Sequence, residues 1–235
     1  MDLVVRLFAV LRERAGVSEL RLSDLPEGLD VASLKAEVAR RHPELGELAH
    51  VACVVGTSYV EDGTRLAKDD EVSLLPPVSG GAEDRVADED LEAGVFELCA
   101  ASLDTGAAEA RVAHPSCGAV VSFTGRTRAT NRGRSVVRLD YEAFDAMSGP
   151  EMRRIFDECR ARHGGGGERA LRMLCQHRVG TVGVGEPSVV IAVASPHRDA
   201  AFSAARYLID TLKARLPVWK KEVYEDGHHW IGDRS

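Results

Sequence analysis

Basic side chains gather in two stretches of the second half of the chain, where they could hold a small anionic ligand. Five arginines fall between residues 126 and 138 with no acid among them: Arg126, Arg128, Arg132, Arg134 and Arg138. Residues 197–221 add seven basic side chains against two acids: His197, Arg198, Arg206, Lys213, Arg215, Lys220 and Lys221. Several cations held together can bind a multiply charged anion through charge-assisted hydrogen bonds.

The predicted elements place some of these cations where ligand sites commonly form. The apolar run Ser188–Ser195 predicts a buried central strand, and a helix is expected from about Asp199 to Leu216. His197 and Arg198 then lie at the N-terminus of that helix, where backbone N–H groups attract anions. Lys213 lies near its other end, on the polar face. The apolar residues expected on its buried face are Phe202, Ala205, Leu208 and Leu212. A solvated helix face beside an ordinary arginine-rich loop is the alternative interpretation.

Further patterns predict the elements around these cations. Strands are expected over 118–124, where GAVVSFT is apolar, over 137–143, where apolar and charged residues alternate, and over 170–176. Ser148 and Glu151 have the spacing of a capping box and predict a helix that starts at Ser148. Its buried face would carry Met152, Ile155, Phe156 and Cys159.

The first 81 residues have the pattern of a compact β-grasp. A strand is expected from Leu3 to Val10, followed by a turn at residues 14–16. Asp30 is a plausible N-cap for a helix that Pro43 ends, and two short strands follow at 52–55 and 71–75. Pro76, Pro77, Val78, Ser79, Gly80 and Gly81 then predict an extended tail. The fold class is therefore α+β, with a β-grasp (ubiquitin-like) domain first.

Composition divides the chain into units and excludes several classes of protein. Residues 1–81 carry a net charge of −5, the joint 82–92 another −5, and residues 93–235 carry +3. No run approaches 18 apolar residues, and the start is unlike a signal peptide, so we expect a cytoplasmic protein without a membrane span. Five widely spaced cysteines without a CxxC pair argue against zinc sites and disulfides, and no metal is expected. The net charge of −7 and 5% aromatic content argue against nucleic acid as partner.

Three blocks of the second half and two of the first half resemble a known enzyme. VRLFAVLRERAG and DDEVSLLPPVSGG resemble the small subunit of molybdopterin synthase, a ubiquitin-like sulfur carrier whose terminal Gly-Gly becomes a thiocarboxylate. GAVVSFTGRTR, ASPHRDAAF and LKARLPVWKKE resemble the large, catalytic subunit. The chain therefore looks like a fusion: a sulfur-carrier domain at 1–81, an acidic linker at 82–92, and a catalytic domain at 93–235 with an α/β-hammerhead-like fold.

The resemblance implies a substrate and a set of site residues. The large subunit binds cyclic pyranopterin monophosphate, and the reaction adds two sulfurs from carrier thiocarboxylates to make the dithiolene of molybdopterin. The implied catalytic residues are Lys213, Lys220 and Gly81. The implied substrate-binding residues are Phe123, Arg126, Thr127, Arg128, His197, Arg198, Lys221, Glu222 and Arg234, the last acting across a homodimer interface. Neither cofactor nor metal is implied for the protein itself.

One departure from the family concerns Gly81, which is followed by Ala82 instead of being the last residue. The family's activating enzyme adenylates a free carboxylate, so we expect a protease to cut the chain after Gly81. Two alternatives stay open at this point. One is a non-catalytic ubiquitin-like adaptor fused to an anion-binding module, and the other is a persulfide sulfurtransferase that uses a cysteine such as Cys117.

Overall fold

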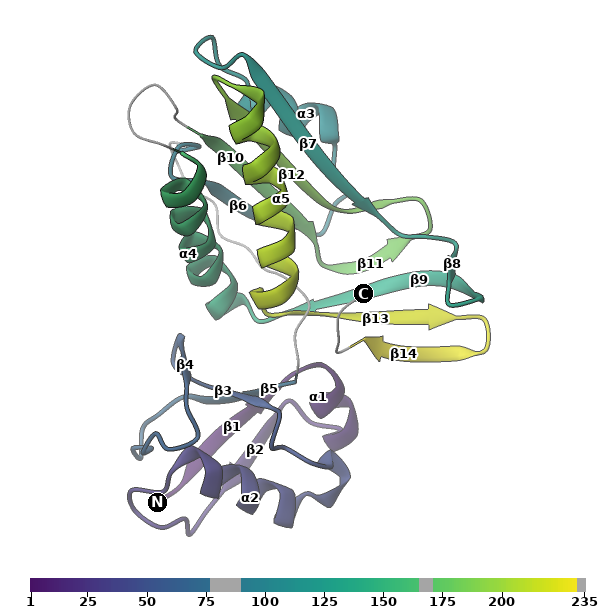
Figure 1. Cartoon of the computed structure of the whole chain (residues 1–235). Helices are drawn as coiled ribbons and strands as arrows, with labels where there is room; N and C mark the ends of the chain where they lie inside the picture. Colours follow the sequence, from purple (N-terminus) through teal and green to yellow (C-terminus); the bar gives the residue numbers. More distant parts are fainter. Residues whose placement is uncertain (77–89, 165–170, 232–235) are drawn as a thin grey trace. The chain divides into compact units, whose positions relative to one another are not determined.

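The structure is a computed structural model that describes residues 1–76, 90–164 and 171–231. The chain divides into two compact units, Met1–Val78 and Ser79–Ser235 (Figure 1). Each unit has its own hydrophobic core and is described separately. No helix in the described part of the chain is long and apolar enough to cross a membrane.

The first unit is a five-stranded sheet covered on one face by a helix. Its strands are β1 (Leu3–Leu7), β2 (Glu19–Leu22), β3 (Ala52–Val55), β4 (Ser58–Val60) and β5 (Val72–Leu75). The order across the sheet is β2-β1-β5-β3-β4, with β1 and β5 parallel. Helix α2 (Val31–Arg41) packs its apolar face, Val31, Leu34 and Val38, on the sheet. Helix α2 ends at Arg41, just before Pro43, as predicted, and a short 3-10 helix, Pro43–Leu45, follows it. This arrangement confirms the predicted β-grasp.

Local chemistry sets the ends of the helices in this unit. The Asp30 carboxylate accepts a hydrogen bond of 2.8 Å from the Ser33 amide, which confirms the predicted N-cap of α2. The expected strand from Leu3 to Val10 is wrong, because the chain leaves the sheet after Leu7 and forms α1 (Ala9–Ala15). The residues of α1 favour helix, and Gly16 ends it in the left-handed conformation that glycine adopts without strain.

The second unit holds two sheets. The first has the order β6-β10-β12-β7, and the second is antiparallel with the order β11-β9-β13-β14, where β8 also pairs with β9. The strands of the first sheet are β6 (Val95–Cys99), β7 (Ala119–Arg126), β10 (Arg172–Arg178) and β12 (Pro187–Ser195). Those of the second are β8 (Thr130–Asn131), β9 (Arg134–Ala143), β11 (Gly180–Gly183), β13 (Val218–Tyr224) and β14 (Gly227–Ile231).

Helices cover both faces of the first sheet, so its middle strand β12 is buried along its whole length. Helices α4 (Asp145–His163) and α5 (Arg198–Arg215) lie on one face, and α3 (Thr105–Val112) lies on the other (Figure 1). Every residue of β12 is buried: Val189, Ile191 and Val193 face α4 and α5, whereas alternate residues face α3. The expected central strand is confirmed, as is the buried state of Cys159 and Cys175.

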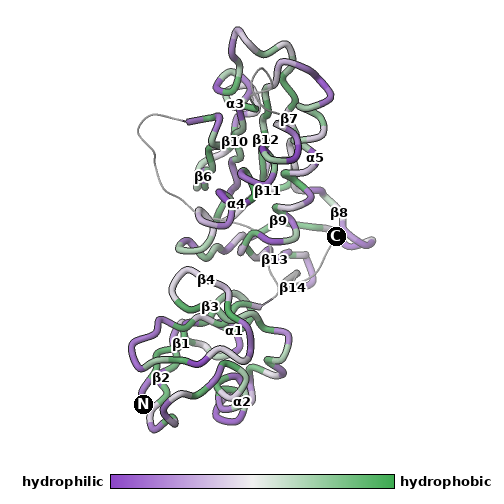
Figure 2. Tube along the Cα trace, turned by 60° about the vertical axis from the view of Figure 1, so that its left-hand side comes forward, coloured by the Kyte–Doolittle hydropathy of each residue, from purple (hydrophilic) through white to green (hydrophobic). Residues whose placement is uncertain are grey.

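Two details of the predicted helices are wrong. Helix α4 starts at Asp145, one turn before the expected capping box, and the Ser148 hydroxyl donates to the Phe144 carbonyl instead of capping the helix. Phe202, expected on the buried face of α5, is 62% exposed. The buried stripe of α5 runs through Ala201, Ala204, Ala205, Leu208 and Leu212, and Phe202 lies about 100° around the helix from Ala201. Figure 2 colours the chain by residue hydropathy, and hydrophilic (purple) and hydrophobic (green) residues are mixed along the helices.

Candidate functional site

The two lysines expected to be catalytic lie on either side of one corner of the second unit. Lys213 is exposed in the last turn of α5, and Lys220 is the third residue of β13. Figure 1 shows α5 running directly into β13. Leu216 and Trp219 are buried between the two lysines, and the Phe144 amide donates to the Pro217 carbonyl at 3.0 Å. Packing of the intervening residues therefore fixes the backbone positions from which the two lysine side chains extend.

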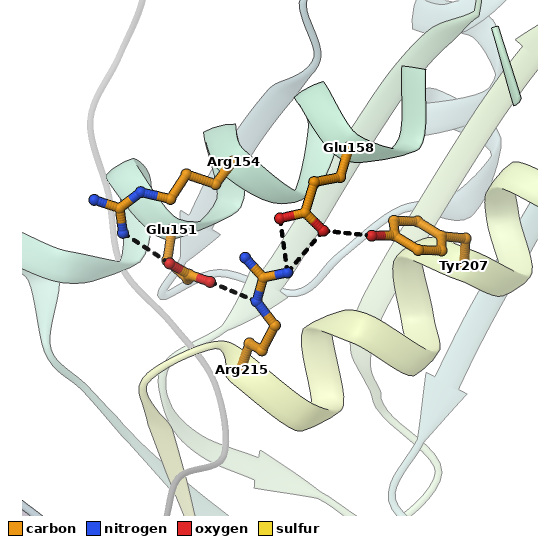
Figure 3. A network of polar contacts seen from close by, with 5 residues as sticks. All are labelled: Glu151, Arg154, Glu158, Tyr207 and Arg215. Carbon is orange, nitrogen blue, oxygen red and sulfur yellow. Dashed lines mark hydrogen bonds and ion pairs between the residues drawn. The ribbon is translucent and has the colours of Figure 1, made fainter. Parts of the chain in front are cut away.

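A set of ion pairs fastens this corner to α4 (Figure 3). The Arg215 guanidinium donates through Nε to Glu151 at 2.7 Å and through Nη1 to both oxygens of Glu158 at 2.9 and 2.8 Å. Tyr207 donates to Glu158 at 2.6 Å, and Arg154 donates to Glu151 at 2.9 Å. Hydrogen bonds from Arg215 and then Tyr207 hold the pKa of Glu158 below its usual value. We call Arg215, Glu151 and Glu158 the helix clamp.

Strand β13 divides the three predicted residues Lys220, Lys221 and Glu222 between its two faces. Successive side chains of a strand alternate, so Lys220 and Glu222 share one face and Lys221 lies on the other. Lys220 Nζ lies 3.2 Å from Glu222 Oε1. The β9 residue opposite Lys221 is Asp140. The structure therefore brings Lys220 together with Glu222 and separates Lys221 from both.

Glu222 is a buried carboxylate, 3% exposed, with partners on both oxygens. Its Oε2 accepts hydrogen bonds from Asn131 Nδ2 at 2.8 Å and from the Tyr224 hydroxyl at 2.5 Å. Burial by itself raises the pKa of Glu222, but these two hydrogen bonds and the Lys220 charge outweigh it and leave the pKa below the usual value. Glu222 is therefore ionised at neutral pH.

The predicted loop after β7 reaches this carboxylate through Asn131. Phe123 is half-buried against the core, and Arg126 is exposed and donates to the Gly185 carbonyl at 2.8 Å. Thr127 is 3% exposed, and its hydroxyl has no hydrogen-bond partner among the described residues. Arg128 is exposed beside it. The loop therefore presents two exposed arginine side chains and one buried hydroxyl without a partner among the described residues, and Asn131 at its end joins it to β13.

His197 and Arg198 lie at the opposite end of α5 from Lys213. His197 is the N-cap residue and Arg198 the first residue of the helix, and both are exposed. Fifteen residues separate Arg198 from Lys213, which corresponds to about 22 Å along a helix. One copy of the chain does not bring these side chains to one point.

Two expected positions and the cysteines complete the comparison with the sequence. Gly81 and Arg234 lie outside the described residues. No group of three or more His, Cys, Asp or Glu side chains in the described ranges could hold a metal ion. Burial raises the pKa of the Cys159 thiol to about 12, far from a reactive thiolate.

Sequence reasoning missed the residues that support the lysines. Tyr224 continues the alternation of Lys220 and Glu222 along β13, and that period of two could have placed it on the same face. Asn131 lies 91 residues before Glu222, and nothing in the sequence joins the two. Glu151 was assigned to a capping box, whereas its carboxylate binds two arginines.

Comparisons with known proteins find relatives of both units of the chain. The family model described as MoaE protein matches residues 98–215, and the ThiS family model matches residues 5–81. The molybdopterin synthase catalytic subunit of Culex quinquefasciatus is 49% identical over 125 residues, which are 53% of this chain and 77% of that protein. The catalytic subunit of Bacillus subtilis is 37% identical over 139 residues, which are 59% of this chain and 85% of that protein.

A solved structure gives the same result. The crystal structure of molybdopterin synthase from Staphylococcus aureus has 34% sequence identity and a TM-score of 0.55. The match covers 59% of this chain and 97% of that one. The expected pair of a ubiquitin-like carrier fold and a synthase catalytic fold is confirmed. The chain belongs to the family of molybdopterin synthase catalytic subunits and carries a ThiS-family unit in front of the catalytic one.

Proposed function

We propose that the second unit transfers sulfur to cyclic pyranopterin monophosphate and that the first unit, ending at Gly81, carries that sulfur as a thiocarboxylate. Membership of the family already assigns the chain to molybdenum cofactor biosynthesis. The observation that best supports the chemical step is the corner where Lys213 and Lys220 flank the α5–β13 connection, with the loop that holds Arg126 and Arg128 joined to β13 by Asn131.

The proposed step moves one sulfur at a time. The thiocarboxylate sulfur forms a bond to a carbon of the pterin side chain as the carbon–oxygen bond at that carbon breaks. The oxygen leaves on the phosphate, which opens the cyclic phosphate, or as water from a hydroxyl, and the product is a thioester between the carrier and the pterin. Water then cleaves the acyl–sulfur bond and returns Gly81 as a carboxylate, and a second carrier repeats the sequence. Lys213 is the candidate for proton transfer, and Arg126 and Arg128 are candidates for binding the substrate phosphate.

We infer that a second copy of the chain supplies the rest of the binding set. His197 and Arg198 lie too far along α5 from Lys213 to share a small ligand with it in one copy. A two-fold dimer through the second unit would place the N-terminus of one α5 beside the other copy's lysines, and Arg234 would act across the same interface. Each pocket would then contain residues of both copies.

The position of Gly81 calls for processing of the chain. Gly81 is followed by Ala82 through an ordinary peptide bond, so it has no free carboxylate to adenylate. We propose that a protease cuts after Gly81 and that an adenylating enzyme then activates the new terminus, both in the cytoplasm. The acidic segment 82–92 provides the charged sequence at which a protease can act.

The test is the intact mass of the protein purified from its own cells. We expect two fragments divided between Gly81 and Ala82, the smaller one heavier by the exchange of oxygen for sulfur. A single uncut species in cells that make molybdopterin would overturn the carrier role of the first unit. Addition of cyclic pyranopterin monophosphate to the thiocarboxylated protein should then yield molybdopterin, and no product would overturn the synthase assignment for the second unit.

A further inference from the structure

The two oxygens of the buried Glu222 carboxylate have different partners. Oε1 faces Lys220 Nζ at 3.2 Å, whereas Oε2 accepts both hydrogen bonds from Asn131 and Tyr224. The two donors come from β8 and from β13, so they approach the carboxylate from separate elements. Rotation of the carboxylate would break two hydrogen bonds at once, and Oε1 is therefore held toward the lysine.

The charged and titratable groups around Glu222 come from the strands on both sides of it, and His229 of β14 lies opposite Glu222 in the register. Lys220 and Tyr224 face it from β13, and Tyr141 faces it from β9, where burial and then the Glu222 charge raise the pKa of that phenol. Arg134 stacks over the Tyr224 ring at 3.8 Å and pairs with Asp226 at 2.6 Å. Arg134, one of the arginines of the basic loop, therefore orients Tyr224 and does not point to a ligand.

We propose that Asn131 and Tyr224 are positioning residues that hold Glu222 as an ionised counterion of Lys220, so that Lys220 acts as a fixed cation in the reaction. This inference rests on the proposed function, in which Lys220 is a catalytic residue. It assigns different tasks to the two lysines. Lys220 would stabilise the negative charge that develops on the acyl oxygen of the carrier when water attacks the thioester.

Lys213 has the opposite environment and therefore the complementary task. It is exposed and has no ion pair or hydrogen bond in the part of the chain that the structure describes. No carboxylate of the described residues pairs with its side-chain amine, which leaves Lys213 as the candidate for the proton transfer of the proposed function. The sequence left open which lysine transfers the proton, and the pairing of Lys220 with Glu222 distinguishes them.

The first test measures the protonation of Glu222 directly. In the full chain labelled with carboxyl-¹³C glutamate, Glu222→Gln identifies the Glu222 signal, whose titration is then followed toward acid pH by NMR. Asn131→Ala and Tyr224→Phe each remove one hydrogen bond that lowers the pKa of Glu222, so each should move the midpoint upward by about one pH unit. If Asn131→Ala fails to fold, Tyr224→Phe, which loses only a hydroxyl, still decides the result.

The second test connects that shift with the reaction. The reaction is followed in the thiocarboxylated protein supplied with cyclic pyranopterin monophosphate. In both variants the acid limb of the pH profile of kcat should move to higher pH by the same amount as the midpoint, while KM for the pterin stays unchanged. Arg132→Asn is the matched control, because it removes an exposed cation from the same loop and asparagine tolerates the positive φ of 48° there. Neither its midpoint nor its acid limb should move.

The outcomes separate this inference from the proposed function. An unchanged Glu222 midpoint in both variants would overturn the positioning role. A shifted midpoint with an unchanged acid limb would overturn the link between Glu222 and Lys220 in catalysis. Failure of the unaltered protein to make molybdopterin would overturn the proposed function instead, and the NMR titration would still decide whether Asn131 and Tyr224 hold Glu222 in its ionised form.

Discussion

At the scale of single residues, His177 couples the stability of the second unit to pH. The ring is buried at the end of β10, lies edge-on to Tyr141 with centroids 5.0 Å apart, and donates from Nδ1 to the Arg178 carbonyl at 2.8 Å. Burial lowers the pKa of His177 to about 4. The folded protein therefore binds this proton less readily than the unfolded chain does.

The resulting prediction concerns acid pH. Between about pH 6.5 and pH 4 the unfolded state carries the proton and the folded state does not, so the free energy of unfolding should fall with decreasing pH, by about 3 kcal/mol in all. His177→Phe should be less stable at neutral pH but should lose this dependence. Urea unfolding followed by tryptophan fluorescence measures it, because both tryptophans, Trp219 and Trp230, belong to the second unit.

His114→Phe serves as the control, since His114 is an exposed histidine of the same unit. It should keep the slope of the unaltered protein between the two pH values. An equally steep slope in His177→Phe would show that other groups cause the acid sensitivity, and the assignment to His177 would be wrong.

At the scale of elements, the helix clamp determines how firmly α5 is held against α4. Arg215→Met would leave the Glu151 carboxylate, which is 5% exposed, with Arg154 as its only ion-pair partner among the described residues. A buried carboxylate that loses a hydrogen bond of this kind costs about 1–3 kcal/mol. We expect Arg215→Met to lower the free energy of unfolding of the second unit by that amount, as measured by urea unfolding at pH 7.

Arg153→Met makes the same change at an exposed position of α4, where the side chain has no ion pair in the described part of the chain. It should change the free energy of unfolding by less than about 0.5 kcal/mol. Equal losses in the two variants would mean that the clamp contributes nothing beyond the helix propensity of an arginine.

The elements also mark how far the sequence predicts the structure. The run Ser188–Ser195 predicts a central strand because its interior, residues 189–194, is apolar at every position, as burial on both faces requires. The N-cap at Asp30 was predicted because capping is local. The capping box at Ser148 failed because its two residues bind other partners, and Phe202 failed because alanines form the buried stripe instead. Rules that use only neighbouring residues cannot identify contacts between residues that are far apart in the sequence.

The residues of the candidate site also fall into two groups, those that the sequence identified and those that it missed. Lys213 and Lys220 were found by resemblance, and the corner that joins them follows from the short connection between α5 and β13. Asn131 and Arg215 were not assigned roles, because their partners lie 91 and up to 64 residues away. A residue that supports a catalytic group through a long-range contact carries no signal in a single sequence.

At the scale of the whole molecule, the length of α5 implies that the proposed pocket is built from residues of two copies of the chain. About 22 Å of helix lies between Arg198 and Lys213, which is more than one small pterin can span. If both ends serve one pocket, a dimer contains two pockets, each with Lys213 and Lys220 from one copy and His197 and Arg198 from the other. Variants at the two ends should therefore complement each other.

Mixing experiments test this arrangement. Lys213→Ala and Arg198→Ala should each be inactive alone, but after dissociation and random reassociation half of the dimers are mixed, and each mixed dimer has one intact pocket. We expect about a quarter of the unaltered activity to return. Lys213→Ala mixed with Lys220→Ala is the matched control, because both residues belong to the same copy's share of the pocket and every pocket stays defective. Recovery of activity in the control would show that Lys213 and Lys220 of one copy do not serve the same pocket. No recovery in the first mixture would show that Lys213 and Arg198 in one pocket do not come from different copies.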